Sequence, residues 1–281
     1  MKKVLLPTDF SENAWNAISY AIDMFSDVPC EFYILHTYVP AFYRVDYALG
    51  GPAYSGIDDA MIQATISGLE HTLERIHEKF NNPKHKFHTH YAFNQLTDEI
   101  REYASEQSID MIIMGTKGAS GVMQVLLGSN TVFVMRTARI PVLAIPEGYT
   151  FKSLDRVLFP TDYLKHYEKE ELGELLDLCR LHGAEVQVVH VDEGHILSEE
   201  QESNKKFLED AFQGVPYSFA LLDNEYPPDA IKAYTEKEDF DLLVMMNRKH
   251  SFMERLLLRQ NVDSVGFEIK IPFLVLREKL K

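Results

Sequence analysis

The chain has few of the residues that mark secreted or membrane proteins. Only two of its 281 residues are cysteines, Cys30 and Cys179, and neither has a second cysteine nearby to complete a metal-ligand pattern. No apolar run approaches the roughly 20 residues of a membrane span. The basic start Met1–Val4 is followed by too few apolar residues for a secretory signal. We therefore expect two buried thiols in a cytoplasmic protein.

Clusters of basic residues are also missing. The net charge is −15 at pH 7, and both halves of the chain are acidic. Binding to duplex nucleic acid needs grouped lysines and arginines to neutralise phosphates, so this class of partner is excluded. A composition that is 46% hydrophobic and 25% charged is typical of folded globular proteins. The length is enough for about two domains, each with a core of its own.

Short segments of the first half recur in the same order in the second half. The recurring pairs are Val4–Phe10 and Val157–Tyr163, Phe32–His36 and Val186–His190, Asp98–Tyr103 and Asp229–Tyr234, Asp110–Met114 and Asp241–Met245, and Ile140–Leu143 and Ile271–Leu274. Ordered matches of this kind indicate two copies of one fold. We predict domains at residues 1–148 and 149–281, with the boundary near Glu147–Ser153, where Pro146-Glu147-Gly148 interrupts the pattern.

Four apolar runs of the first copy are continuous rather than alternating: Val4–Leu6, Phe32–Leu35, Met111–Met114 and Val142–Ile145. Continuous runs are typical of strands that are buried on both faces of a parallel sheet. Ser11 is a good N-cap for a helix that follows the first strand, and Leu96–Ala104 predicts another helix. Alternation of strands and helices predicts an α/β fold with right-handed crossovers.

The first copy is longer than the second between its second strand and its third helix, within residues 39–90. This stretch contains Gly50-Gly51-Pro52 with tyrosines nearby, which predicts a long loop, and then a helical pattern from Asp58 to Phe80. Long loops in compact domains are often functional, so residues 40–57 are interpreted either as a lid or as a loop that covers part of the core.

A glycine-rich segment follows the strand Met111–Met114. Gly115-Thr116-Lys117-Gly118 is separated by nine residues from Gly128-Ser129-Asn130-Thr131, which opens a helix. Glycine lets the backbone approach a ligand closely, and the amides of a helix N-terminus attract phosphate. The spacing differs from both the Walker loop and the dinucleotide-binding fingerprint.

This pattern, together with Pro7-Thr8-Asp9 and Ile140–Leu143, resembles the universal stress protein family, and the resemblance extends over both halves of the chain. It implies two tandem Rossmann-like domains of the adenine nucleotide alpha hydrolase type, each a five-stranded parallel sheet flanked by helices. It also implies that the first copy binds an adenine nucleotide, ATP with or without Mg²⁺. The implied role is regulation in a stress response.

The resemblance implies that adenosine lies beside Pro7, Thr8 and Asp9, and that the backbone of Thr37 contacts adenine. The remaining candidate residues would surround the phosphates or line the rim: Met114, Gly115, Lys117, Gly118, Gly128, Ser129, Asn130 and Thr131. Such positions fit the rule that ligands bind beyond the carboxyl ends of strands where the strand order reverses. Taken singly, each glycine is also typical of a turn, Asp9 of a helix start and Lys117 of a solvated loop.

The second copy differs at the decisive positions. The residues that replace Gly115, Gly118, Gly128 and Ser129 are Met246, Lys249, Arg259 and Gln260. We therefore predict that the second copy does not bind nucleotide in this manner. Its basic residues are interpreted either as a site for another anion or as a solvated face on a domain kept for pairing: Arg248, Lys249, Arg255 and Arg259.

An activated nucleophile or a paired general base is not evident, so we expect at most slow ATP hydrolysis. His88 and His90 share one face of a predicted strand, but no third ligand is apparent, and we predict no metal site. Three functions stay open: a nucleotide-dependent regulatory module, a nucleotide-independent interaction or structural protein of the same fold, and a true hydrolase.

The resemblance further implies pairing of the two copies through their last strands, as a pseudo-dimer within one chain. Such pairing would cover backbone groups that an edge strand leaves open. Further association into a homodimer is left open by the sequence.

Overall fold

The computed structural model describes residues 1–38, 59–116, 128–192, 194, 196–223, 226–248 and 270–278. In the first half the elements are β1 (Lys2–Pro7), α1 (Glu12–Met24), β2 (Cys30–Thr37), α3 (Asp59–Lys79), β3 (His85–Ala92), α4 (Leu96–Gln107), β4 (Met111–Gly115), α5 (Ser129–Thr137) and β5 (Val142–Ile145). In the second half they are β6 (Arg156–Pro160), α6 (Gly173–His182), β7 (Glu185–Asp192), α7 (Glu199–Ala211), β8 (Tyr217–Asp223), α8 (Pro227–Lys237), β9 (Leu242–Asn247) and β10 (Phe273–Arg277).

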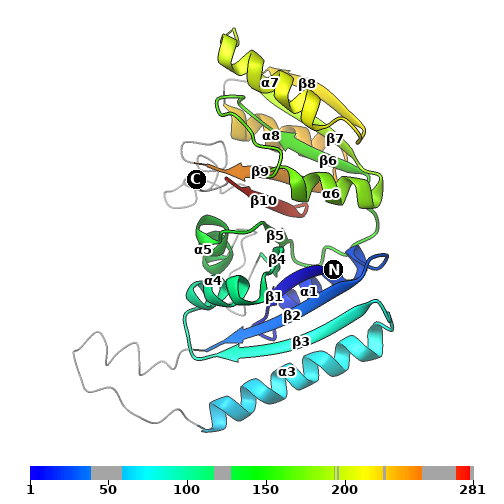
Figure 1. The fold of residues 1–281 in the computed structure, drawn as a ribbon, viewed down its shortest axis with the longest axis vertical. Coiled ribbons are helices and arrows are strands. Elements are labelled where there is room, and N and C mark those ends of the chain that lie inside the picture. Colours follow the sequence, from blue (N-terminus) through cyan, green and yellow to red (C-terminus); the bar gives the residue numbers. More distant parts are fainter. Residues whose placement is uncertain are drawn as a thin grey trace, which may run out of the picture.

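The strands form one sheet that runs through both halves, in the order β3-β2-β1-β4-β5-β10-β9-β6-β7-β8. Neighbouring strands are parallel within each half, whereas β5 and β10 pair antiparallel. Figure 1 shows the halves stacked end to end, with β5 and β10 in the middle and β3 and β8 toward opposite ends. The last strand of each copy therefore finds its partner in the other copy, as the resemblance implied.

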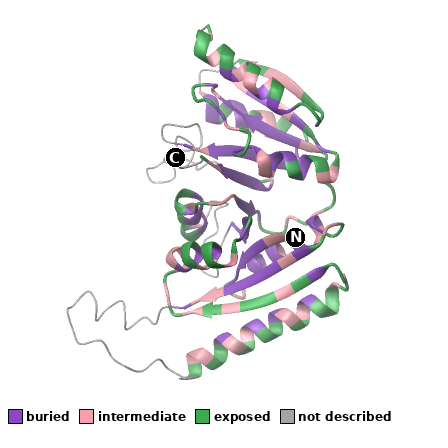
Figure 2. Ribbon diagram, in the orientation of Figure 1, coloured by how far each residue is buried: buried purple, intermediate pink, exposed green. Residues whose placement is uncertain are grey.

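The buried side chains form two hydrophobic clusters, one on each face of the sheet, and each cluster contains residues of both halves. The first lies under α1, α3, α6 and α7, and the second lies under α4, α5 and α8. Figure 2 shows the buried strands continuing from one half into the other. The expectation of one core per copy is therefore wrong, because pairing of β5 with β10 joins the two interiors.

Local sequence explains where many elements begin and end. The Ser11 hydroxyl accepts a hydrogen bond from the Ala14 amide and caps α1, as predicted. Ser198 and Gln201 form a reciprocal capping box at α7. Gly183 ends α6 with a φ of 72°, a left-handed conformation that suits glycine.

The four predicted strands and the helices after Ser11, at Leu96–Ala104 and near Asp58–Phe80 are confirmed, with ends shifted by a few residues. Cys30 and Cys179 are buried and free, as expected. The 40–57 segment, interpreted as a lid or a core cover, lies outside the described residues.

The shared interior predicts that the two halves unfold together. Leu274 of β10 is 0% exposed and lies opposite Leu143 of β5, so Leu274→Ala should cost about 2–5 kcal/mol of unfolding free energy. Trp15 in α1 is the only tryptophan, and its fluorescence therefore reports the first half. In urea, the fluorescence midpoint of Leu274→Ala should fall together with the circular dichroism midpoint.

The control is Leu221→Ala in β8, since Leu221 is 62% exposed and both midpoints should stay in place. A Leu274→Ala chain whose Trp15 transition does not move would show that the halves unfold independently.

Candidate functional site

Seven of the described candidate residues lie where three neighbouring strands of the first half end: Pro7, Thr8, Asp9, Thr37, Met114 and Gly115 follow or end these strands, and Thr131 of α5 is bonded to Gly115. β1 is hydrogen-bonded to both β2 and β4, so the residues that follow Pro7, Thr37 and Gly115 meet at one edge of the sheet. The strand order reverses between β1 and β4. Open α/β sheets bind ligands in the crevice outside such a reversal.

The turn after β1 is held by its own side chains. The Thr8 hydroxyl accepts a hydrogen bond from the Phe10 amide at 3.0 Å, and Asp9 Oδ1 accepts from the Ser11 hydroxyl at 2.6 Å. Phe10 has a φ of 64°, and its ring stacks on His36 of β2 with centroids 4.3 Å apart. His36 Nδ1 lies 2.8 Å from the Thr8 carbonyl oxygen. These contacts fix the backbone of Thr8 and Asp9 just beyond the end of β1.

The N-terminus of α5 is tied to the end of β4. The Thr131 hydroxyl donates to the Gly115 carbonyl at 2.9 Å, and the Gly128 amide donates to the Thr116 carbonyl. Gly128 occupies the N-cap position without a side-chain hydrogen bond to the helix. The first turn of α5, whose N-cap glycine has no side chain to bond its backbone N–H groups, therefore begins beside the end of β4.

Gly115 lies in close contact with α1. A Cβ at Gly115 would lie 2.5 Å from Asn13 Nδ2 and 3.0 Å from the Asn13 carbonyl oxygen. Asn13 belongs to α1 and is buried. Packing of β4 against α1 therefore requires a glycine at position 115. The sequence did not predict this contact, because Gly115 and Asn13 lie far apart in the chain.

Ten of the twelve predicted site residues are described. Pro7, Thr8, Met114, Gly115 and Thr131 are buried, Thr37 and Gly128 are half-buried, and Asp9, Ser129 and Asn130 are exposed. Lys117 and Gly118 lie outside the described residues. Of the residues that were assigned to phosphate, Thr131 directs its hydroxyl to the Gly115 carbonyl rather than outward.

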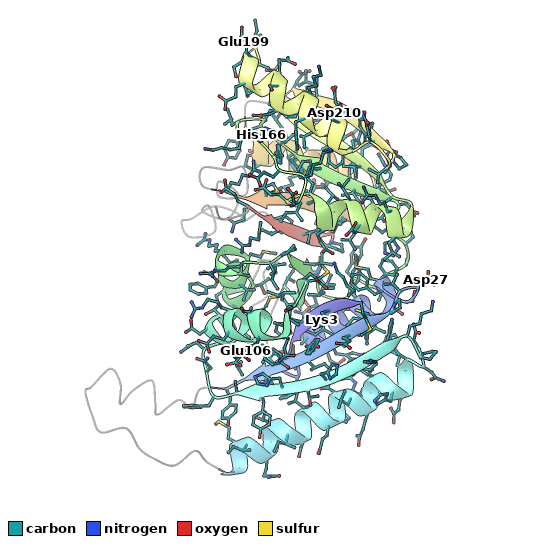
Figure 3. The ribbon with its side chains drawn as sticks, viewed as in Figure 1. Lys3, Asp27, Glu106, His166, Glu199 and Asp210 are labelled. Carbon is teal, nitrogen blue, oxygen red and sulfur yellow. The ribbon has the colours of Figure 1, made fainter. Side chains whose placement is uncertain are left out.

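The second half repeats the turn after its first strand. Tyr163 has a φ of 56°, its amide donates to the Thr161 hydroxyl at 3.1 Å, and its ring stacks on His190. His190 Nδ1 lies 2.9 Å from the Thr161 carbonyl oxygen. His166, labelled in Figure 3, lies near α7, where its ring is 3.3 Å from the Asn204 side chain.

In the second half, a cluster of buried side chains lies beyond the ends of β6 and β9. The Tyr167 hydroxyl lies 2.6 Å from the Thr161 hydroxyl, and the Arg248 guanidinium lies over the Tyr167 ring at 4.4 Å. Arg248 and Glu171 form an ion pair at 2.5 Å, and both side chains are 4% exposed. Thr161 follows β6 and Arg248 follows β9, so this cluster lies at the strand ends that correspond to those of β1 and β4.

The interpretation of Arg248 as part of a solvated basic face is therefore wrong. Arg248 is buried and its charge is matched by Glu171. Hydropathy alone could not find this pair, because its members are 77 residues apart. Lys249, Arg255, Arg259 and Gln260 lie outside the described residues.

Other reactive groups have structural roles. His90 Nε2 lies 2.7 Å from Glu99, and the His88 ring stacks on Tyr33. Across the residues that the structure describes, no group of three potential ligands could hold a metal ion. Burial raises the pKa of the Cys30 and Cys179 thiols to about 12, which makes them poor nucleophiles. In the same described ranges, no helix is long and apolar enough to cross a membrane.

One sheet that is parallel within each half, with helices on both faces and a reversal of strand order in each half, defines a tandem doubly wound α/β protein. The model of the Universal stress protein family matches residues 1–146 and again residues 153–277. The chain therefore belongs to the universal stress protein family and carries two family segments in tandem.

Two relatives match about half of the chain each. Universal stress protein MJ0531 of Methanocaldococcus jannaschii is 30% identical over 146 residues, which are 51% of this chain and 81% of that protein. Universal stress protein YxiE of Bacillus subtilis is 28% identical over 146 residues, which are 51% of this chain and 97% of that protein.

Two solved structures match both halves at once. A universal stress protein from Archaeoglobus fulgidus has a TM-score of 0.68 at 21% identity, covering 98% of this chain and 96% of its own. A putative universal stress protein from Pseudomonas aeruginosa has a TM-score of 0.59 at 12% identity, covering 99% and 93%. At these identities the likeness shows the tandem fold alone.

Gly115→Ala should destabilise the chain by about 1–3 kcal/mol, because the added Cβ overlaps Asn13 and forces α1 or β4 to shift. The matched control is Gly173→Ala in α6, where an added Cβ meets nothing within 4 Å and a small gain is expected from helix propensity. Urea unfolding measures both changes. Equal stability of the two variants would contradict the close contact between β4 and α1.

Glu171→Gln should cost about 3–5 kcal/mol of unfolding free energy, because it leaves the Arg248 guanidinium buried without its counter-charge. Replacing the pair together, with Glu171→Leu and Arg248→Met, should restore most of the loss. The same urea measurement tests both chains. A Glu171→Gln chain as stable as the native protein would mean that the pair is solvated.

Proposed function

We propose that the first half binds an adenine nucleotide, ATP with or without Mg²⁺, and that the second half does not. One observation carries the proposal: β4 lies beside β1, and its end is hydrogen-bonded to the N-terminus of α5, where the N-cap is a glycine. The spacing of Gly115, Gly118 and Gly128 supports the proposal further, because it matches the pattern that ATP-binding members of the family carry. Residues 1–148 would form the nucleotide-binding domain and residues 149–281 the degenerate domain.

The proposed contacts lie around the ends of β1, β2 and β4 and the first turn of α5. The backbone of Thr37 would contact adenine, and Pro7, Thr8 and Asp9 would line the adenosine side. Gly115, Gly118 and the first turn of α5, Gly128–Thr131, would surround the phosphates, with Met114 and Lys117 at the rim. The Thr131 hydroxyl is bonded to the Gly115 carbonyl, so we assign its contribution to holding α5 in place and to its backbone N–H.

We propose regulation as the role of this binding. Nucleotide would order the phosphate-binding segment and change a surface that a partner recognises. Rapid turnover is not part of the proposal, because no activated nucleophile is evident among the described residues at the ends of β1, β2 and β4; slow hydrolysis by an ordered water is compatible with the proposal. Two buried, free cysteines support action in a reducing compartment such as the cytoplasm.

The test is the shift in melting temperature caused by millimolar ATP with magnesium, compared between the native chain and Ser129→Asp. Ser129 is exposed in the first turn of α5, where an acidic side chain suits the helix dipole but repels phosphate. Ligand at a hundredfold excess over Kd stabilises the folded state by roughly 2.7 kcal/mol. We expect a clear shift in the native chain and its loss in Ser129→Asp.

Ser203→Asp is the control, since it makes the same replacement on the exposed face of α7 and should keep the full shift. Absence of a shift in the native chain would overturn nucleotide binding and favour a nucleotide-independent interaction protein. An equal shift in melting temperature in the native chain and in Ser129→Asp would show that the nucleotide does not contact the N-terminus of α5.

A further inference from the structure

Phe10 lies beside the proposed nucleotide site in an unusual backbone conformation. It directly follows Asp9, and its φ of 64° is left-handed. Bulky residues rarely adopt this conformation, which persists only where the surrounding contacts hold it. The Thr8 hydroxyl accepts a hydrogen bond from the Phe10 amide at 3.0 Å. The Phe10 ring is held separately, by contacts with α3 and β2.

The helix α3 meets the Phe10 ring at a glycine. A Cβ at Gly68 would lie 2.6, 2.7 and 2.9 Å from three carbon atoms of this ring, so a larger residue fits only if the ring shifts. Gly68 stands near the middle of a helix of 21 residues, where glycine is less favourable than alanine. Close packing against Phe10 gives a physical reason for glycine at this position.

His36 connects the Phe10 ring to the backbone of the proposed site. The two rings stack with centroids 4.3 Å apart and 25° between their planes. His36 Nδ1 lies 2.8 Å from the Thr8 carbonyl oxygen, and since a carbonyl only accepts, Nδ1 is the donor. These contacts form one continuous series from α3 to the Thr8 backbone. A shift of the Phe10 ring by α3 therefore disturbs the ring that holds the Thr8 carbonyl.

We propose that Phe10 is a positioning residue for the proposed nucleotide site and that α3 controls it through Gly68. The inference rests on the proposed function, in which Thr8 and Asp9 line the adenosine side. Packing of α3 against Phe10 holds these two residues in the conformation that binds adenosine. Displacement of α3 lowers the affinity for nucleotide. Bound nucleotide favours the packed position of α3 by the same factor, because coupling between two sites is reciprocal.

The second half of α3 is tied to the surface of α1. Arg75 donates hydrogen bonds to both carboxylate oxygens of Glu12, at 2.9 and 3.1 Å, and its guanidinium lies 4.2 Å from the centroid of the Trp15 ring. The Glu12 side chain is 79% exposed. The helix α3 therefore connects the adenosine side of the proposed site to an exposed surface, which is what the proposed regulatory role needs.

The second half of the chain has the same turn with a different helix contact. Tyr163 stacks on His190, but the helix α7 reaches this turn through side-chain hydrogen bonds. Asn204 donates to the Tyr163 carbonyl at 2.8 Å, and Gln201 donates to the Asp162 carbonyl at 2.9 Å. Since we propose that this half does not bind nucleotide, Tyr163 provides a matched ring whose role is structural alone.

The test is the affinity of the full chain for ATP with magnesium, measured by isothermal calorimetry in the native chain, Phe10→Leu and Gly68→Ala. Each variant should bind ATP about tenfold more weakly than the native chain, a size typical of coupling between two sites. The double variant should show about the same loss as one single variant, because both substitutions act through the same ring.

Two controls separate positioning from stability. Tyr163→Leu removes the equivalent ring of the second half and should keep the native affinity for ATP. The melting temperature without ATP should change little in Gly68→Ala, because the helix propensity of alanine offsets the shift of the ring. Weaker ATP binding in a variant of nearly native melting temperature is an effect that a purely structural contact does not produce.

Native affinity for ATP in both Phe10→Leu and Gly68→Ala would overturn this inference and leave the nucleotide site in place. An equal loss of affinity in Tyr163→Leu, or losses that multiply in the double variant, would overturn it as well. If Phe10→Leu does not fold, the affinity of Gly68→Ala decides. Absence of ATP binding in the native chain would overturn the proposed function and this inference with it.

Discussion

The antiparallel pairing of β5 with β10 is the contact on which the rest of the structure depends. It places Leu143 against Leu274 and turns two parallel sheets into one. Each helical layer then covers a hydrophobic cluster that belongs to both halves. A β5 edge without this partner would expose unpaired backbone groups and apolar surface. The second half therefore stabilises the first, although the two halves differ at the positions of the proposed nucleotide site.

The two halves share the backbone turn after their first strand but differ in the residues that lie beyond it. The turns at Phe10 and Tyr163 have the same left-handed conformation and stack on equivalent histidines. Beyond them, the first half leads to the glycine segment and α5, whereas the second half inserts Tyr167 with the Arg248–Glu171 pair. Asn247 and Arg277 of the second half bond the carbonyl end of α5, so the helix that begins at the proposed nucleotide site ends on the other domain.

The sequence predicted the buried strands and the repeat because these depend on local patterns. Val4–Leu6 and Met111–Met114 are continuous apolar runs, and Ser11 is a cap whose partner is three residues away. Contacts between distant residues could not be predicted in this way. The sequence pattern did not indicate that Arg248 pairs with Glu171. It also did not indicate that Gly115 contacts Asn13. The position of the candidate site at the strand ends could be predicted from the order of strands and helices. The hydrogen bond from the Thr131 hydroxyl to the Gly115 carbonyl could be found only in the structure.

The central claim is that a chain with two family segments has one nucleotide site. Native mass spectrometry of the intact protein with saturating ATP and magnesium measures this directly, because each bound nucleotide adds a fixed mass. We expect one nucleotide per chain, with no second adduct as the ATP concentration rises. Two nucleotides per chain would contradict the proposal that the second half does not bind nucleotide, and none would contradict the proposed site of the first half.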